Sequence, residues 1–218
     1  ETAHVAGLPE TSGDPSPVTA LGVFYGLRAA VRHRLGQDSL EGLTVAVQGL
    51  GAVGRSLADQ IAAAGGKLIV ADIREDAVQK AVQELGAEAV HVDAIYDTPA
   101  EVFAPCALGA ILNDETIPRL QSTVIAGSAN NQLAEGRHGI VLRQQKMLYA
   151  PDYAINAGGI INIAHEDRAA GTYDKAGALE AVGRIDDTLA EIFIRADATD
   201  TPTSVIADAM AEERLNED

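Results

Sequence analysis

Three glycines in residues 49–54 stand at the spacing Gly-x-Gly-x-x-Gly. The segment follows the apolar, β-branched run at residues 43–48 and precedes apolar residues at helical spacing, which continue until Gly65. A short apolar run bounded by turn residues is typical of a strand that is buried on both faces of a parallel sheet. The segment therefore predicts a strand, a tight turn and a helix, and this order is compatible with few folds.

Strands and helices continue to alternate along the chain. Residues 67–71 predict a second buried strand, and Asp72 can cap a helix that ends at Gly86. Near the N-terminus, Ser16 is expected to be an N-cap with Pro17 at the first helical position. The other predicted strands are 89–92, 102–104, 124–126 and 148–150, and the other predicted helices are 137–146, one that begins after Gly159, 174–195 and a terminal one from 201.

This alternation predicts an α/β fold of the Rossmann-like, doubly wound type. We expect a mostly parallel sheet with helices on both faces, and extra helices at about 16–35 and about 174–217. The sequence contains neither an internal repeat nor a linker-like stretch, so we predict a single dinucleotide-binding domain over residues 1–218.

Each glycine of the segment has its own physical reason to be there. Gly49 permits the tight turn, Gly51 lets the backbone approach a pyrophosphate, and Gly54 lets the helix pack close to the strand. The amides of the helix N-terminus attract negative charge. A plain glycine-rich turn is the alternative, but the flanking strand and helix favour a dinucleotide site. Its predicted contacts are Gly49, Leu50, Gly51, Ala52, Val53 and Gly54.

Asp72 closes the second predicted strand, at the place where a carboxylate can bond the hydroxyls of an adenosine ribose. A 2'-phosphate would meet that carboxylate with a repulsion of about 4 kcal/mol, if the effective dielectric is ~20. NAD is therefore the predicted cofactor, and Ile73 is expected to lie in the same site. Arg74 keeps NADP open as an alternative, because an arginine near this position can bind the 2'-phosphate.

Composition excludes several other classes of protein. The chain has 32 acidic and 16 basic residues, a formal charge of -16 that opposes binding to nucleic acid. Its apolar runs are too short to cross a bilayer, and the lone Cys106 fits a reducing compartment, so we expect a cytoplasmic protein. The histidines show no paired ligand spacing, and we expect no metal site.

Four further motifs accompany the glycine segment in order along nearly the whole chain. With it, they resemble the C-terminal domain of the Glu/Leu/Phe/Val dehydrogenase family, most closely its leucine, valine and phenylalanine branch. The motifs are Ser-Gly-Asp-Pro-Ser-Pro-Val-Thr at 12–19, Ala-Pro-Cys-Ala-Leu-Gly at 104–109, Gly-Ser-Ala-Asn-Asn-Gln-Leu at 127–133, and Pro-Asp-Tyr-Ala-Ile-Asn-Ala-Gly-Gly at 151–159.

The resemblance implies a function and a set of contacts. The family oxidatively deaminates amino acids and passes a hydride from the α-carbon to nicotinamide. By this resemblance Thr19 would contact the nicotinamide carboxamide, Ala129 and Asn130 would line its ribose, and Asn156 would face the substrate carboxylate beside the cofactor. Cys106 and Ala107, in a loop after a predicted strand, would also contact the cofactor. Cys106 has no neighbouring base in the sequence, so we do not expect it to act as a nucleophile.

Two residues and the wording of the motifs bear on the substrate. Ile185 and Thr188 are one helical turn apart and are expected either to approach the substrate side chain or simply to pack. A branched aliphatic amino acid fits the leucine-like motifs best, with phenylalanine second and glutamate third.

Amine oxidation needs a base near the α-carbon, commonly a lysine with a lowered pKa. By the resemblance that lysine lies in a separate N-terminal domain, and the lysines here are expected to face solvent: Lys67, Lys80, Lys146 and Lys175. The chain begins at Glu1 without an initiator Met, so we expect part of a homo-oligomeric enzyme that lacks its N-terminal catalytic domain. Such a chain would bind cofactor without turnover; a free-standing dinucleotide-binding or regulatory module is the alternative.

Overall fold

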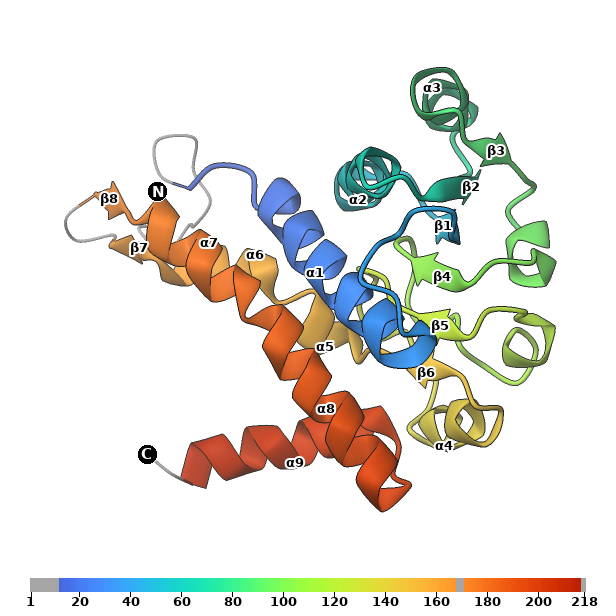
Figure 1. Cartoon of the computed structure of the whole chain (residues 1–218). Helices are drawn as coiled ribbons and strands as arrows, with labels where there is room; N and C mark the ends of the chain where they lie inside the picture. Colours follow the sequence, from blue (N-terminus) through green and yellow to red (C-terminus); the bar gives the residue numbers. More distant parts are fainter. Residues whose placement is uncertain (1–11, 168–170, 217–218) are drawn as a thin grey trace.

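A computed structural model describes residues 12–167 and 171–216. Its six-stranded sheet has the order β3-β2-β1-β4-β5-β6, and every neighbouring pair is parallel (Figure 1). The strands are β1 (Thr44–Gln48), β2 (Lys67–Ala71), β3 (Glu88–Ala89), β4 (Val102–Pro105), β5 (Val124–Ile125) and β6 (Leu148–Tyr149). The predicted Rossmann-like α/β fold is confirmed.

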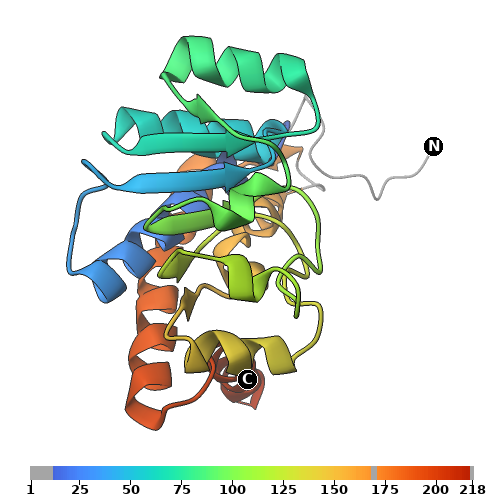
Figure 2. The same cartoon turned by 90° about the vertical axis from the view of Figure 1, so that its right-hand side faces the viewer.

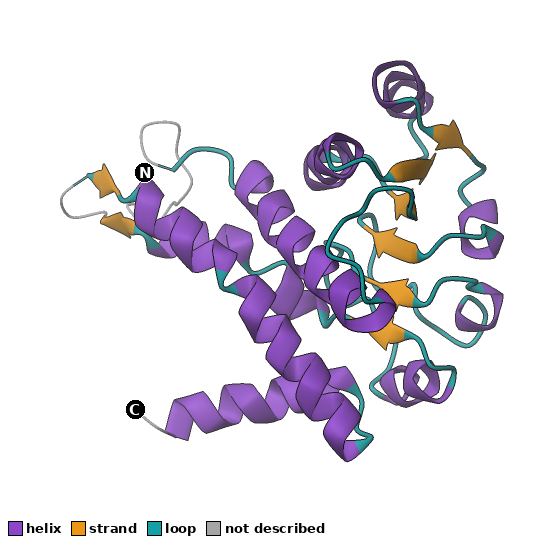
Figure 3. Cartoon of the chain, viewed as in Figure 1, coloured by secondary structure: helices purple, strands orange, loops and turns teal. Residues whose placement is uncertain are grey.

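Helices cover both faces of the sheet (Figure 3). Side chains alternate along β1, so Val45 and Val47 join one apolar cluster and Ala46 joins the other. Because both faces are buried, the strands are apolar at nearly every position. One face carries α1 (Ser16–Leu35), α2 (Ala52–Ala63) and α3 (Glu75–Leu85); the other carries η1 (Ala94–Asp97), η2 (Ile117–Arg119) and α4 (Arg137–Gln144).

The C-terminal third of the chain packs beside α1 at the side of the sheet domain (Figures 1 and 2). A small antiparallel pair, β7 (Glu166–Asp167) and β8 (Thr172–Tyr173), precedes the last helices. The helices are α5 (Asp152–Ile155), α6 (Gly158–Ala164), α7 (Lys175–Gly183), α8 (Ile185–Thr199) and α9 (Thr203–Asn216). None of the helices in the described ranges is both long and apolar enough to span a membrane.

Two glycines on α1 allow this close packing. A Cβ atom at Gly26 would lie 2.5 Å from side-chain carbons of Ile155 and Leu189, and one at Gly22 would lie 2.7 Å from Ile185 Cδ1. Real Cβ contacts are not that short, so α5 and α8 approach α1 as closely as they do because these positions lack a side chain.

Two predicted caps are wrong in position. Pro15 occupies the cap of α1 and Ser16 is already helical, which places the start one residue earlier in the pattern than expected. Asp72 does not cap α3, because Arg74 is still extended, with ψ 104°, and the helix begins only at Glu75. Cap residues signal a helix start, but the actual start depends on where the backbone leaves the sheet.

Strand ends also differ from prediction. The strand expected at 89–92 is the two-residue β3, which pairs at the edge of the sheet and then turns into η1. β4 continues one residue further than expected, to Pro105, and β5, β6 and α4 end earlier than expected. Apolar runs extend beyond the residues that are actually paired, because the chain stays buried after the ladder ends.

The long helix predicted at 174–195 is wrong: it is two helices, α7 and α8, which meet at Arg184. Apolar positions continue through the junction, so their spacing gives no sign of the break, while α7 packs mainly on α6 and α8 packs mainly on α1. The short helix α5 was not expected either. The terminal helix begins at Thr203, two residues after its predicted start, and its predicted last residue, 217, lies outside the described residues.

The packing of α1 gives the first prediction. Gly26→Ala should lower the free energy of unfolding by about 1–3 kcal/mol, because the new methyl group overpacks the contact with Ile155 and Leu189. Gly183→Ala is the matched control, since it also lies in a helix and a Cβ atom there would have no neighbour within 4 Å. The control should be neutral or stabilising by up to about 1 kcal/mol. Urea unfolding curves measure both, and equal stability of the two variants would contradict the prediction.

Candidate functional site

The carboxyl ends of β1 and β4 border the point where the sheet order reverses. The chain proceeds from β1 to β2 on one side, whereas β4 proceeds to β5 on the other. In open α/β sheets this switch point forms a crevice that binds ligands. Here the crevice is an open cleft of about 550 Å³. It brings together six of the predicted residues: Gly49, Gly51, Asp72, Ile73, Cys106 and Ala107.

The three glycines of the turn after β1 have distinct environments. Gly49 has φ 97°, which favours glycine, and a Cβ there would lie 2.8 Å from the Cβ of Ala107. A Cβ at Gly54 would lie 2.1 Å from the carbonyl oxygen of Gly49, so only glycine lets α2 begin this close to β1. Gly51 caps α2 and has no atom within 4 Å of its Cβ position. The space over the helix N-terminus is therefore open.

The residues between these glycines contribute mainly backbone to the cleft. The Leu50 side chain is buried in the core, Val53 packs partly against the same core, and Ala52 is exposed at the start of α2. The first N–H groups of a helix have no partner within the helix, and they carry partial positive charge. This end of α2 is suited to hold an anionic group.

Asp72 fastens the turn to the end of β2. Its Oδ2 accepts a hydrogen bond from the Leu50 N–H at 2.5 Å, and its Oδ1 accepts one from the Arg74 N–H at 2.8 Å. Burial alone would raise the pKa of Asp72, but the two backbone hydrogen bonds and the positive charge of Arg74 lower it. The carboxylate is thus ionised at neutral pH and stands at the rim of the cleft.

The mouth of the cleft is apolar. The side chains of Ile73 and Leu108 line it and are 87% and 74% exposed. Grouped at the mouth of one cleft, these two side chains form an apolar surface that a ligand could cover. The Arg74 guanidinium lies beside them, where it donates to the Leu50 carbonyl at 2.7 Å.

Sequence reasoning missed seven residues of the cleft, among them Gln48, Tyr96 and Leu108. Gln48, the last residue of β1, donates from Nε2 to the Tyr96 hydroxyl at 2.7 Å, and both residues line the cleft with Leu108. A polar residue at the end of an otherwise apolar strand is a signal that could have identified Gln48. Tyr96 lies in η1, a turn that no pattern in the sequence predicts.

A second cluster lies at the ends of β5 and β6. The Asn156 Nδ2 donates to Asn130 Oδ1 at 2.6 Å and to the Ser128 carbonyl at 3.2 Å. The Ala129 N–H donates to the Pro105 carbonyl at 2.9 Å, which ties this loop to the end of β4. None of these residues lines the first cleft.

Thr19 belongs to the same side of the molecule. It lies in the first turn of α1, and its hydroxyl donates to the Pro15 carbonyl at 3.0 Å. A Cβ at Gly159 would lie 2.6 Å from that hydroxyl oxygen, so the start of α6 and the start of α1 are in contact there. Thr19 therefore lies beside the helix that follows Asn156.

Comparison with known proteins agrees with this geometry. Residues 12–74 and 69–196 match the family described as Glutamate/Leucine/Phenylalanine/Valine dehydrogenase. The chain belongs to this family. It is 51% identical over 218 residues to a leucine dehydrogenase of Thermoactinomyces intermedius, with 99% of this chain and 59% of that protein covered. It is 43% identical over 223 residues to a phenylalanine dehydrogenase of Caldalkalibacillus thermarum, with 99% and 60% covered.

Solved structures of the family have the same fold. The L-tryptophan dehydrogenase of Nostoc punctiforme superposes with a TM-score of 0.89 at 42% identity, covering 94% of this chain and 61% of that one. A hetero-hexameric glutamate dehydrogenase of Thermus thermophilus, at 23% identity and a TM-score of 0.74 over 94% and 53%, shows the fold alone. The 218-residue chain thus spans less than two thirds of the length of these relatives.

Ile185 and Thr188 lie apart from the cleft at the switch point. They line a separate groove of about 510 Å³ between α5, α6, α8 and α9, where Ala157 also contributes. Ile185 is 4% exposed and packs toward Gly22, whereas Thr188 is half-buried. One lining residue of the groove, Ala157, directly follows Asn156 in the sequence. Neither of these two residues lines the cleft at the switch point.

The ionisable side chains of this chain offer little reactive chemistry. All four of its lysines are exposed, and none lines the cleft. Burial raises the pKa of the Cys106 thiol despite hydrogen bonding with Ser128, which disfavours a nucleophilic thiolate. Over residues 12–167 and 171–216, no group of three or more His, Cys, Asp or Glu side chains could hold a metal ion.

The surroundings of the glycines predict different changes in stability for alanine at two of these positions. Gly54→Ala should lower the free energy of unfolding by about 1–3 kcal/mol, because its methyl group collides with the Gly49 carbonyl. Gly51→Ala should change stability by no more than about 0.5 kcal/mol, since its Cβ meets open space and its φ of -65° suits alanine. Chemical denaturation measures both, and a strongly destabilised Gly51→Ala variant would show that the space is not open.

Proposed function

We propose that this chain is the NAD-binding part of an enzyme that oxidatively deaminates a branched-chain L-amino acid to a 2-oxo acid. The observation that carries the proposal is the pairing of an ionised Asp72 with the open N-terminus of α2 at the switch point. A diphosphate fits the helix N-terminus, and a ribose diol fits the carboxylate beside it.

The chemistry of the residues at both ends of the site supports a dinucleotide. The Gly51 backbone leaves a cradle that a Cβ would fill, and Ile73 and Leu108 offer apolar surface for an adenine ring. At the other end, Thr19 and Asn130 supply the hydroxyl and amide groups that a carboxamide and a ribose require. When bound, the nicotinamide ring accepts a hydride from the α-carbon of the amino acid.

We favour NAD over NADP because of the charge at Asp72. Its lowered pKa keeps the carboxylate ionised across the neutral range, so a 2'-phosphate would be repelled at close range. Arg74 lies 3.5 Å from Asp72 and offsets part of this charge, but its guanidinium already donates to the Leu50 carbonyl and is 53% exposed, so solvent screens it.

On the substrate side, Asn156 directs both amide hydrogens to the Ser128 carbonyl and Asn130 Oδ1, so it would donate to a substrate carboxylate by exchanging one of these bonds, without adding charge to the site. Ile185 and Thr188 line the apolar groove and would contact an aliphatic side chain from this part of the protein. Leucine dehydrogenase relatives at about half identity support a branched aliphatic substrate, with an aromatic amino acid second.

The base that removes the amine proton is not among the exposed lysines of this chain. The relatives extend beyond the matched region, which covers 59% of the leucine dehydrogenase, and we place the catalytic lysine in that additional part. The chain by itself would then bind cofactor without turnover. The whole enzyme would act in the cytoplasm as a homo-oligomer.

Calorimetry tests the cofactor proposal directly. NADH titrated into the purified 218-residue chain should release heat with a single site, and Gly51→Ala should bind at least about tenfold more weakly because its methyl group occupies the pyrophosphate cradle. Leucine and NAD added to the same chain should give no rise in NADH absorbance. Absence of binding to folded chain would refute cofactor binding, and amino-acid-dependent NADH formation would refute the missing base.

Cofactor preference gives a separate prediction. Asp72→Ser should narrow the gap between NADH and NADPH affinity by about tenfold or more, because it removes the charge that opposes the 2'-phosphate. Asp76→Ser is the matched control: this exposed acid lies in the first turn of α3 and does not line the cleft. Fluorescence titration with both cofactors measures the ratio, and an unchanged ratio in Asp72→Ser would speak against NAD selection by this residue.

A further inference from the structure

The loop at 127–131, proposed above to face the nicotinamide ribose, has a backbone shape that needs support. Asn131 has φ 52°, in the left-handed region that residues with side chains rarely adopt. Asn130 precedes it directly, so the direction of the Asn130 side chain depends on this conformation. Such backbone shapes persist only where surrounding contacts hold them.

Asp152 supplies one of these contacts. It is 8% exposed at the start of α5, and its Oδ2 accepts a hydrogen bond from the Asn131 N–H at 2.7 Å. Its Oδ1 accepts from the Tyr149 hydroxyl at 2.7 Å. Burial and the charge of Asp152 raise the pKa of Tyr149, so the phenol remains a donor throughout the physiological range.

Gln132 holds the same loop from the inside. It is fully buried, and its Nε2 donates to the carbonyls of Gly127 and Ala129, both at 2.9 Å. Both amide hydrogens of the side chain are therefore used on the loop. Its Oε1 finds no partner among the described residues, so burial of this side chain leaves one acceptor unpaired.

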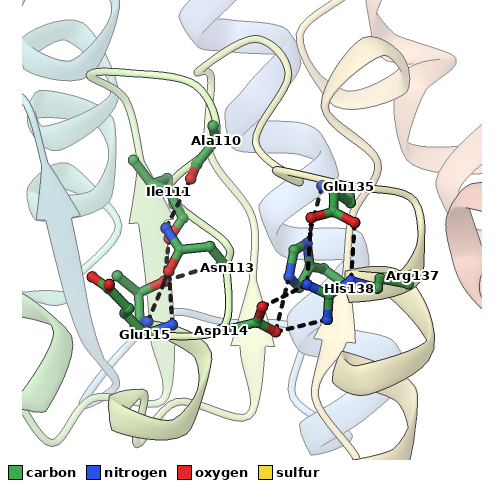
Figure 4. Close-up of polar contacts among 9 residues, drawn as sticks. Ala110, Ile111, Asn113, Asp114, Glu115, Glu135, Arg137 and His138 are labelled. Atoms are coloured by element: carbon green, nitrogen blue, oxygen red, sulfur yellow. Dashed lines mark hydrogen bonds and ion pairs between the residues drawn. The ribbon is translucent and has the colours of Figure 1, made fainter.

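The segment at 110–114 also contacts the loop at 127–131. The Ala110 N–H donates to the Asn131 carbonyl at 2.6 Å. That segment is fixed in turn by Asp114, which lies between Arg137, at 2.5 Å, and His138, at 3.3 Å (Figure 4). The loop thus contacts the segment at 110–114 on one side, while Asp152 and Gln132 bond its backbone.

The geometry points to Gln132 and Asp152 as positioning residues that set the nicotinamide half of the cofactor site. Both bond the loop backbone on either side of Asn130, whose Oδ1 receives the Asn156 amide at 2.6 Å. Neither lines the adenosine cleft. The inference rests on the proposed cofactor, and it predicts that the two halves of the dinucleotide respond differently to loss of these side chains.

Two substitutions in the whole chain test it. Asp152→Ala removes the acceptor for the Asn131 N–H. Gln132→Met removes both loop bonds, and the simultaneous loss of the unpaired Oε1 partly offsets the two carbonyls left without a donor. Each should weaken NADH binding by about tenfold and leave ADP binding within about twofold of the parent chain. ADP is the probe because it keeps the adenosine and diphosphate but lacks the second ribose and nicotinamide.

Matched variants separate positioning from general damage. Asp208 on α9 resembles Asp152 in that its carboxylate accepts a tyrosine hydroxyl, here that of Tyr153 at 2.5 Å. Asp208→Ala should change neither the NADH affinity nor the ADP affinity. Asp152→Asn keeps an oxygen that can accept from Asn131 and should restore most of the NADH affinity. Thermal melting confirms that each variant is folded.

The outcomes are distinct. If the parent chain binds neither ADP nor NADH, the proposed function fails. The positioning role is overturned if the parent chain binds ADP and NADH with equal affinity. It is also overturned if folded Gln132→Met loses affinity for ADP and NADH to the same extent, or loses affinity for neither. Selective loss of NADH in Asp152→Ala and Gln132→Met supports it.

Discussion

The close approach of α2 to the end of β1 determines the geometry of the rest of the site. The Gly49 carbonyl occupies the space that a side chain at Gly54 would need, so the helix can begin directly over the crevice. Its first amides then point to the place where the sheet order reverses. Asp72 fixes this turn to β2 through the Leu50 N–H. The cleft is therefore a product of tight packing between three backbone segments rather than of a mobile loop.

The two parts of the site are built with different chemistry. Around Asp72 the contacts come from backbone amides, one carboxylate and the exposed apolar side chains of Ile73 and Leu108. Around Asn130 the contacts depend on polar groups that are themselves buried, Gln132 and Asp152. Burying such groups is unfavourable unless they are hydrogen-bonded, and here most of their bonds go to the backbone of one loop. This arrangement favours a fixed loop conformation.

Local patterns predicted much of this structure. The buried strands β1 and β2 and the glycine turn between them were found because apolar runs and glycine spacing are local properties. The break at Arg184 was missed because the apolar spacing continues across it, and the direction of α8 is set by its packing on α1. Tyr96 was missed because its position depends on η1, a turn without a sequence signal. The partners of Asp152 could not be predicted either, since an acidic residue in a motif does not reveal which amide it will meet.

The strand order separates the two parts of the site within the sheet. Asp72 follows β2 and the Asn130 loop follows β5, with β1 and β4 lying between them. Substitutions at distant positions without shared partners usually have additive effects. Within the proposed cofactor site, a change of coenzyme preference at the end of β2 should therefore leave the Asn130 loop unaltered, and a change in that loop should leave the preference unaltered.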